Sequence, residues 1–227
     1  MNINNLVEKF ESSINGLKKV FFENDNNFFF TEKELHSYFY HLCLQNEFIF
    51  NKYNLIHTEY PTPFKCKNIK DEPYIEMTNK DSKDLRGHID LVLINPNFID
   101  FSFQQNKVKS ENIIMGLGHF LFSKYINTFY EVYNEFGKKY NESILLYSLE
   151  FKYIRHTAVG EKYPAIEIKR DINKLKLLEN FQIFKDIPFS KYNKSLVFIG
   201  NRISENTIRS INNVKNENSN YCELFKK

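Results

Sequence analysis

Two apolar stretches that contain charged residues constrain the fold of this chain more than any other feature. Residues 145–154 read Leu-Leu-Tyr-Ser-Leu-Glu-Phe-Lys-Tyr-Ile, and residues 86–94 read Arg-Gly-His-Ile-Asp-Leu-Val-Leu-Ile. Side chains alternate along a strand, so Glu150 and Lys152 share one face of the first stretch. Apolar residues on both faces predict strands that are covered on both sides. Charges in such strands are costly unless they serve each other or an ion.

The rest of the chain predicts helices and strands that alternate. An apolar stripe predicts a helix over 2–23, and Thr31 with Glu34 three residues later matches a capping box for a helix that ends near Asn46. Apolar spacing also predicts a long helix from Glu111 to Tyr140. Further strands are expected at 55–61, 195–200 and 221–225, and further helices at 170–178 and 205–214. This order predicts an α/β sandwich around a central mixed β-sheet.

Composition sets the broad class of the protein. A chain of 227 residues is expected to form a single domain over 1–227. The net charge of +3 permits a nucleic-acid partner. Three cysteines without close spacing argue against a disulfide framework or a zinc cluster, and together with the lack of a secretory signal they favour the cytoplasm. No apolar run approaches the ~18 residues of a membrane span.

The charged strands resemble the PD-(D/E)XK nuclease superfamily, which has the restriction-endonuclease-like fold. Asp90 matches the first acid, and Glu150-Phe151-Lys152 matches the second acid, the variable position and the lysine. Ile89 stands where the family often has proline. The resemblance covers a core of about residues 31–200, after an N-terminal helix at 2–23 and with a helical insertion at about 110–140 that lies within the span 91–149.

The resemblance implies a Mg²⁺ site for phosphodiester cleavage, at which Mn²⁺ is expected to substitute. Asp90, Glu150 and the Phe151 backbone carbonyl would be the metal ligands, and Asp90, Glu150 and Lys152 the catalytic residues. Lys152 would orient or deprotonate the attacking water, or stabilise the charged phosphorane. The alternative for Glu150 and Lys152 is an ion pair at a solvated strand end.

Two further acids compete for a third carboxylate role. Glu34 lies on the helix that Thr31 begins, but its capping-box position gives it a structural role of equal weight. Glu59 lies in the strand expected at 55–61. His88 shares a strand face with Asp90, where it could support the site or simply be a structural residue.

A second Glu-x-Lys sequence, Glu167-Ile168-Lys169, must be weighed against the first. It continues into the apolar stripe of the helix at 170–178, so it is expected to begin that helix, with Glu167 as a solvated acid of the first turn. If it were a strand instead, Glu167 and Lys169 would take the active-site roles. Arg86, Lys169 and Lys174 are candidate phosphate contacts.

These observations predict a Mg²⁺-dependent endonuclease that acts on DNA in defence, restriction or repair. A non-catalytic nucleic-acid-binding or assembly module on the same fold is the alternative, and a ribonuclease is a third hypothesis. A homodimer is also considered, because the aromatic helix at 111–140 could form an interface, although such a stripe can equally belong to a core.

Overall fold

The computed structural model describes most of the chain: residues 2–24, 31–46, 48–50, 52–65, 75–76, 86–104, 122–156 and 162–227. Its helices are α1 (Ile3–Glu23), α2 (Glu32–Leu44), α3 (Pro96–Gln104), α5 (Phe122–Tyr140), α6 (Tyr163–Asn180) and α7 (Glu205–Glu217). Its strands are β1 (Ile49–Phe50), β2 (Tyr53–Asn54), β3 (Ile56–Lys65), β4 (Ile75–Glu76), β5 (Arg86–Ile94), β6 (Leu145–His156), β7 (Gln182–Phe184), β8 (Ile187–Pro188), β9 (Ser190–Arg202) and β10 (Cys222–Lys226). Among the described helices, none has the length and apolar character needed to cross a membrane.

The main sheet is mixed, as the sequence predicts. Its strands follow the order β10-β9-β6-β5-β3-β4, in which β10 runs parallel to β9 and β3 runs antiparallel to β5 and β4. Helices flank the sheet, so the expected α/β class is confirmed. The chain divides into two compact units. The first comprises Ile49–Ser148 and Lys176–Asn193, and the second comprises Asn2–Phe48, Leu149–Leu175 and Lys194–Lys227.

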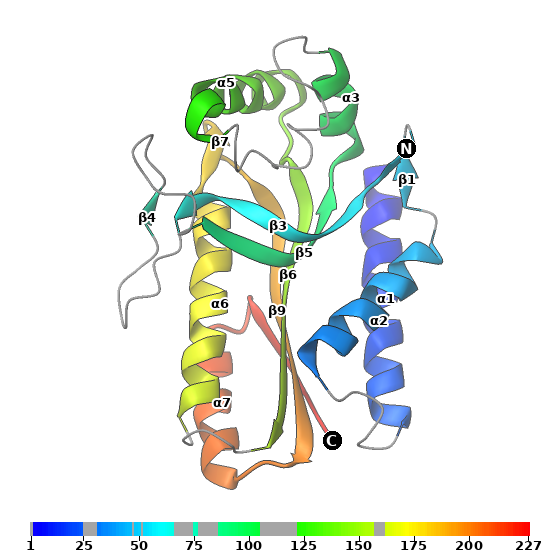
Figure 1. Ribbon diagram of the computed structural model, residues 1–227, viewed down its shortest axis with the longest axis vertical. Coiled ribbons are helices and arrows are strands. Elements are labelled where there is room, and N and C mark those ends of the chain that lie inside the picture. The colour runs from blue at the N-terminus through cyan, green and yellow to red at the C-terminus, as the bar shows by residue number, and fades with distance from the viewer. Residues whose placement is uncertain are drawn as a thin grey trace. The chain divides into compact units, whose positions relative to one another are not determined.

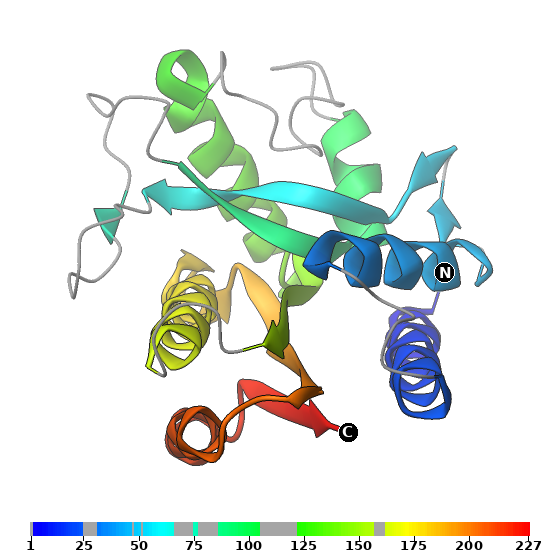
Figure 2. The same cartoon turned by 60° about the horizontal axis from the view of Figure 1, so that its bottom comes forward.

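The second unit has three layers, with α1 and α2 on one face of its strands and α6 and α7 on the other (Figures 1 and 2). Aromatic rings join α1 and α2 to the strands. Phe21 of α1 lies 5.0 Å from Phe198 of β9, and Phe39 of α2 lies 5.3 Å from Phe151 of β6, both measured between ring centroids. Burial of such large apolar rings fixes the two helices against this face of the sheet.

The opposite face of the second unit is aliphatic. Ile154 of β6 belongs to one buried cluster with residues of α6, α7, β9 and β10: Ala165, Ile168, Ile172, Val197, Ile199, Ile211, Val214 and Cys222. Because Glu150, Lys152 and Ile154 are two residues apart along β6, they share the face that α6 covers. This packing places the charged positions of β6 under a helix rather than in open solvent.

The first unit is built on the antiparallel pair of β3 and β5. Its helices α3 and α5 meet through aromatic rings, with Phe98 lying 5.3 Å from Phe136 between centroids. Phe189, at the end of the β7–β8 hairpin, packs edge-on against Tyr133 of α5. Gly137 of α5 allows β7 to approach closely, since a Cβ atom there would lie 2.5 Å from the Phe184 Cβ.

Several sequence predictions are confirmed within the described ranges. The expected stripe of α1 is buried, and Thr31 caps α2 with a complete capping box. The aromatic helix ends at Tyr140 as expected, whereas its predicted first part, 111–121, lies outside the described residues. The strand expected at 55–61 continues to Lys65, and the short helix α3 was not predicted.

Candidate functional site

Glu150 and Lys152 of β6 meet charged residues of α6. The helix packs Ile168, Ile172 and Leu175 into the core, and all three are fully buried. Positions three and four apart share a helix face, so Asp171 and Lys174 lie next to this apolar stripe. The helix therefore presents one carboxylate and one ammonium on the side that also carries its buried residues.

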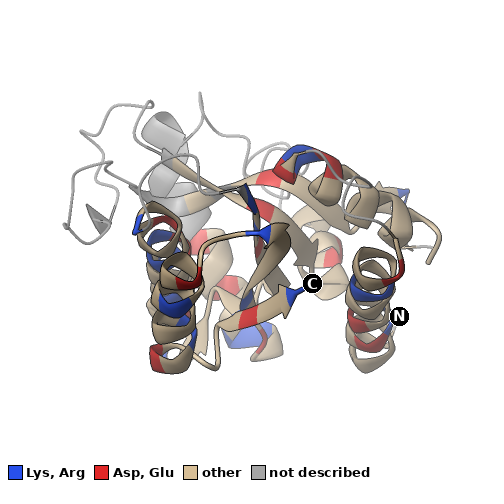
Figure 3. Cartoon of the chain, turned by 90° about the horizontal axis from the view of Figure 1, so that it is seen from below, with Lys and Arg blue, Asp and Glu red and all other residues tan. Residues whose placement is uncertain are grey.

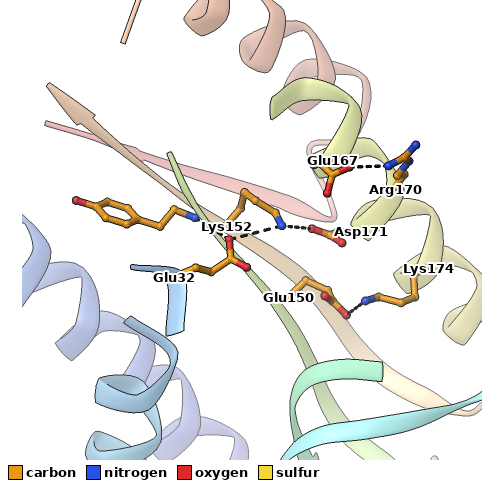
Figure 4. A network of polar contacts seen from close by, with 8 residues as sticks. Glu32, Glu150, Lys152, Glu167, Arg170, Asp171 and Lys174 are labelled. Carbon is orange, nitrogen blue, oxygen red and sulfur yellow. Dashed lines mark hydrogen bonds and ion pairs between the residues drawn. The ribbon is translucent and has the colours of Figure 1, made fainter. Parts of the chain in front are cut away.

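Lys174 forms an ion pair with Glu150. The Lys174 Nζ lies 2.6 Å from the Glu150 Oε1, and the two side chains are 11% and 2% exposed (Figure 4). A buried charge is costly to remove from water, so each partner depends on the other. Removal of one partner of such a pair costs about 3–5 kcal/mol of folding free energy. The burial of Glu150 also excludes the alternative of a solvated ion pair at a strand end.

Lys152 lies between two other carboxylates. Its Nζ is 3.5 Å from the Glu32 Oε2 and 3.4 Å from the Asp171 Oδ2 (Figure 4). The Tyr153 backbone amide also donates a hydrogen bond to the Glu32 Oε2 at 3.2 Å. One acid therefore comes from α2 and the other from α6, and together they fix the ammonium in position above β6.

The network brings carboxylates and ammonium groups from β6, α2 and α6 together. Three carboxylates (Glu32, Glu150 and Asp171) meet two ammonium groups (Lys152 and Lys174). Carboxylate oxygens are the protein ligands that Mg²⁺ prefers.

The sequence analysis missed Glu32 and Asp171, and it considered Glu34 rather than Glu32 as the acid of this helix. The Glu34 Oε2 accepts a hydrogen bond from the Thr31 amide at 2.7 Å, which is the structural role considered for it. Glu32 is the first residue of the same helix, and its carboxylate reaches Lys152 instead. The capping box was a usable signal, because it assigns Glu34 to the helix end and leaves Glu32 as the acid available nearby.

Asp90 lies on β5, in the first unit, whereas Glu150 and Lys152 belong to the second. Asp90 is half-buried. Thr58 pairs with Leu91 and Tyr60 pairs with Ile89, so Glu59 of β3 and Asp90 of β5 each lie between these two ladder pairs. Glu59 is exposed and has a φ of 52°, in the left-handed region that a residue with a Cβ seldom occupies.

The remaining predicted residues have simpler surroundings. Arg86 begins β5, and His88 is half-buried two residues before Asp90. The Phe151 ring is fully buried and stacks on His36 with centroids 5.4 Å apart. Lys169 is exposed on α6. Lys174, one of the three candidate phosphate contacts, reaches the Glu150 network, whereas the side chain of Arg86 lies outside the described part of the structure.

The second Glu-x-Lys sequence is helical, as predicted. Glu167 and Lys169 lie within α6, which begins at Tyr163. The expectation that Glu167 is a solvated acid of the first turn is wrong, because the helix starts earlier than predicted. Glu167 instead accepts a hydrogen bond from Arg170 at 2.6 Å (Figure 4). This segment therefore does not replace Glu150 and Lys152 as a strand-borne pair.

The residues of the network fit Mg²⁺ by donor type. Within the described ranges, no three His, Cys, Asp or Glu side chains form a group arranged to hold a metal ion. Mg²⁺ does not require such a group, since it is usually bound by one or two carboxylates, water and the phosphate of its substrate. Glu150 would be the carboxylate ligand in this network, and Lys174 is the cation that holds it here.

Comparison with known proteins adds no relative. No protein-family model, no curated protein and no solved structure matches the chain.

Proposed function

We propose that this protein is a Mg²⁺-dependent nuclease that hydrolyses phosphodiester bonds, with DNA as its substrate. The observation that carries the proposal is the surroundings of Lys152. Its ammonium is held by Glu32 and Asp171, two residues along β6 from the buried carboxylate of Glu150. An acid and a lysine in this order on a covered strand are what the resemblance to PD-(D/E)XK nucleases implies.

Each side chain of the network has a distinct role in this proposal. Lys152 supplies positive charge and hydrogen-bond donors for the attacking water or the scissile phosphate. Glu32 and Asp171 restrict the rotation of the long lysine side chain, so that its charge is already in place before substrate binds. Bound Mg²⁺ would lower the pKa of a coordinated water and neutralise phosphate charge. Asp90 and the Phe151 backbone carbonyl are proposed as further metal ligands, on the basis of the sequence pattern.

The partner is proposed from chemistry rather than from a basic surface. Helices of the protein carry both signs of charge (Figure 3), and the net charge is only +3. Association with nucleic acid would therefore depend on a local site and would weaken with salt as phosphate contacts release counterions. We propose DNA as the substrate, a cytoplasmic location and Mn²⁺ as a substitute for Mg²⁺.

A cleavage assay tests the proposal. The variants Glu150→Gln, Asp90→Asn and Lys152→Ala should each lower Mg²⁺-dependent cleavage of DNA by at least about a hundredfold, because each loses a group that acts on the water or the phosphate. EDTA should abolish cleavage by the unchanged protein. Circular dichroism must show that each variant is folded, since Glu150 is half of a buried ion pair.

Lys169→Ala is the matched control for Lys152→Ala. Lys169 is exposed on α6, so its loss should lower cleavage far less than the loss of Lys152, even if Lys169 contacts a phosphate. Equal loss in both lysine variants, or full activity in Glu150→Gln, would contradict the assignment. Cleavage of RNA alone would keep the chemistry and replace the substrate.

One observation favours a second function. The Glu150 carboxylate forms a nearly fully buried ion pair with Lys174, and a protein that uses the network only for structure would need no more than this pair. A non-catalytic module would bind nucleic acid equally well with and without divalent cations and would cleave neither DNA nor RNA. The same assay, run over several sequences and structures of DNA and RNA, separates the two functions.

A further inference from the structure

The ion pair between Lys174 and Glu150 occupies the carboxylate that the proposed nuclease would use for its metal. The Nζ lies 2.6 Å from the Glu150 Oε1, and the pair is nearly shielded from water. A lysine ammonium is a compact charge on a flexible stem, and its position here is one that a small cation could take. The pair therefore raises the question of which cation Glu150 holds when both are present.

We propose that Lys174 is an internal cation that competes with a divalent metal ion for Glu150. The inference rests on the proposed function, in which Glu150 is a metal ligand. With no metal bound, Lys174 neutralises the buried carboxylate. When Mg²⁺ or Mn²⁺ reaches Glu150, two cations face one carboxylate, and their repulsion makes the metal and the lysine alternative partners.

The position of Lys174 on α6 allows this exchange without movement of the helix. Lys174 is three residues after Asp171, and residues at this spacing are neighbours on a helix surface. The four-carbon stem of lysine can rotate while its Cα stays in place. An ammonium that leaves Glu150 can therefore turn toward the carboxylate of Asp171, which shares the same face of α6.

The exchange would set the metal concentration at which the site is filled. If only molecules in which Lys174 has left Glu150 can bind the metal, the apparent affinity for metal is the intrinsic affinity multiplied by the fraction of such molecules. If nine-tenths of the molecules hold the lysine pair, removal of the lysine charge tightens apparent metal binding by about tenfold. This prediction concerns binding and can be measured without any cleavage.

The first test is the thermal midpoint of Lys174→Met with and without Mn²⁺. Methionine keeps a long, unbranched side chain and removes the charge. Mn²⁺ should raise the midpoint of this variant more than that of the unchanged protein, with an apparent dissociation constant about tenfold lower, because a ligand that binds only the folded state stabilises it according to its affinity. A shift equal to or smaller than that of the unchanged protein would overturn the proposal.

Two control variants define the site. Lys169→Met removes an exposed lysine from the same helix, so its response to Mn²⁺ should equal that of the unchanged protein. Glu150→Gln combined with Lys174→Met removes both charges of the pair and should lose the additional response. A double variant that still gains Mn²⁺ affinity would place the metal elsewhere and overturn the exchange at Glu150.

A measurement on the unchanged protein covers the case in which Lys174→Met does not fold. Lysine acetylation by a water-soluble reagent, followed by mass spectrometry, reports how freely each ammonium can react. Mg²⁺ should increase the acetylation rate of Lys174 several-fold relative to Lys169. An unchanged ratio at a Mg²⁺ concentration that stabilises the protein would show that Lys174 stays on Glu150, and the proposal would fail.

The outcomes also separate this inference from the nuclease proposal. A gain of Mn²⁺ affinity in Lys174→Met without any nucleic-acid cleavage would support the exchange and reject the nuclease. Mg²⁺-dependent cleavage that needs Glu150, with the same metal affinity in Lys174→Met and the unchanged protein, would support the nuclease and reject the exchange.

Discussion

At the scale of single residues, the most informative side chain is Lys152, because two acids from separate helices hold it. Glu32 lies at the start of α2 and Asp171 lies in the middle of α6, and each places a carboxylate oxygen within 3.5 Å of the Lys152 Nζ. A lysine side chain in solvent samples many rotamers, and ordering it costs free energy. The two carboxylates already hold the Lys152 side chain in place, so it does not have to be ordered when substrate binds. Asp171 is therefore a positioning residue in the proposed reaction.

Asp171→Asn should lower kcat for DNA cleavage by roughly ten- to hundredfold while KM stays nearly constant, because a misplaced catalytic group slows the chemical step rather than substrate binding. Steady-state kinetics with a short duplex would measure both constants. Glu167→Gln is the matched control on the same helix, since Glu167 pairs with Arg170 rather than with Lys152. A rise in KM with unchanged kcat would instead assign Asp171 to substrate binding.

At the scale of helices and strands, sequence patterns within a single segment were sufficient to predict some elements. The stripe of α1 and the capping box of α2 were predictable from spacing alone, because both depend on residues a few positions apart. The missed helix α3 had a signal too. Asn95 precedes Pro96, and the Asn95 Oδ1 accepts a hydrogen bond from the Asn97 amide at 2.9 Å, as expected where a proline begins a helix.

The candidate site was predictable only in part, because some of its residues meet only when distant segments pack together. Glu150 and Lys152 stand out because charges interrupt an apolar strand. The partners Asp171, Lys174 and Glu32 depend on how α6 and α2 pack against β6, and this packing follows from contacts between distant segments. The available hint was that Asp171 and Lys174 adjoin the buried positions of their helix, where charged residues need partners.

Gly137→Ala tests the packing of α5 against β7. Alanine favours a helix over glycine by about 1 kcal/mol, but its Cβ would lie 2.5 Å from the Phe184 Cβ. Overpacking of this kind costs about 1–3 kcal/mol, so we expect a lower free energy of unfolding in urea. Gly16→Ala in α1 is the control. A Cβ at position 16 would lie 3.6 Å from the Leu42 Cδ1, which is an ordinary contact, so Gly16→Ala should be more stable than the unchanged protein. If Gly137→Ala were stabilised as well, the close approach of β7 to α5 would be contradicted.

At the scale of the whole molecule, the two ends of the chain are joined in one unit. Glu223 of β10 accepts a hydrogen bond from Lys18 of α1 at 2.9 Å and another from Lys194 of β9 at 2.6 Å. The Lys18 ammonium also lies 4.9 Å from the centre of the Phe225 ring. The carboxylate therefore links the first helix to the last strand, and its charge contributes to the stability of the native state.

The stability of this link should depend on pH. Burial alone would raise the pKa of Glu223, but the hydrogen bonds and charges of Lys194 and Lys18 outweigh burial and hold the pKa below its usual value. A carboxyl whose pKa is lower in the folded than in the unfolded state stabilises the protein above its unfolded pKa, and this contribution is lost as pH falls through the folded value. Thermal midpoints measured between about pH 6 and pH 3 should therefore decline less in Glu223→Gln than in the unchanged protein, since one linked carboxylate has been removed.

Glu23→Gln is the control for this pH dependence. Glu23 and Lys19 are 3.9 Å apart on α1 with both side chains largely exposed, and such surface pairs contribute little to stability. This variant should follow the unchanged protein at every pH. Parallel curves for Glu223→Gln and the unchanged protein would show that the bridge between the chain ends carries no pH-dependent stability, and that acid unfolding begins at other carboxylates.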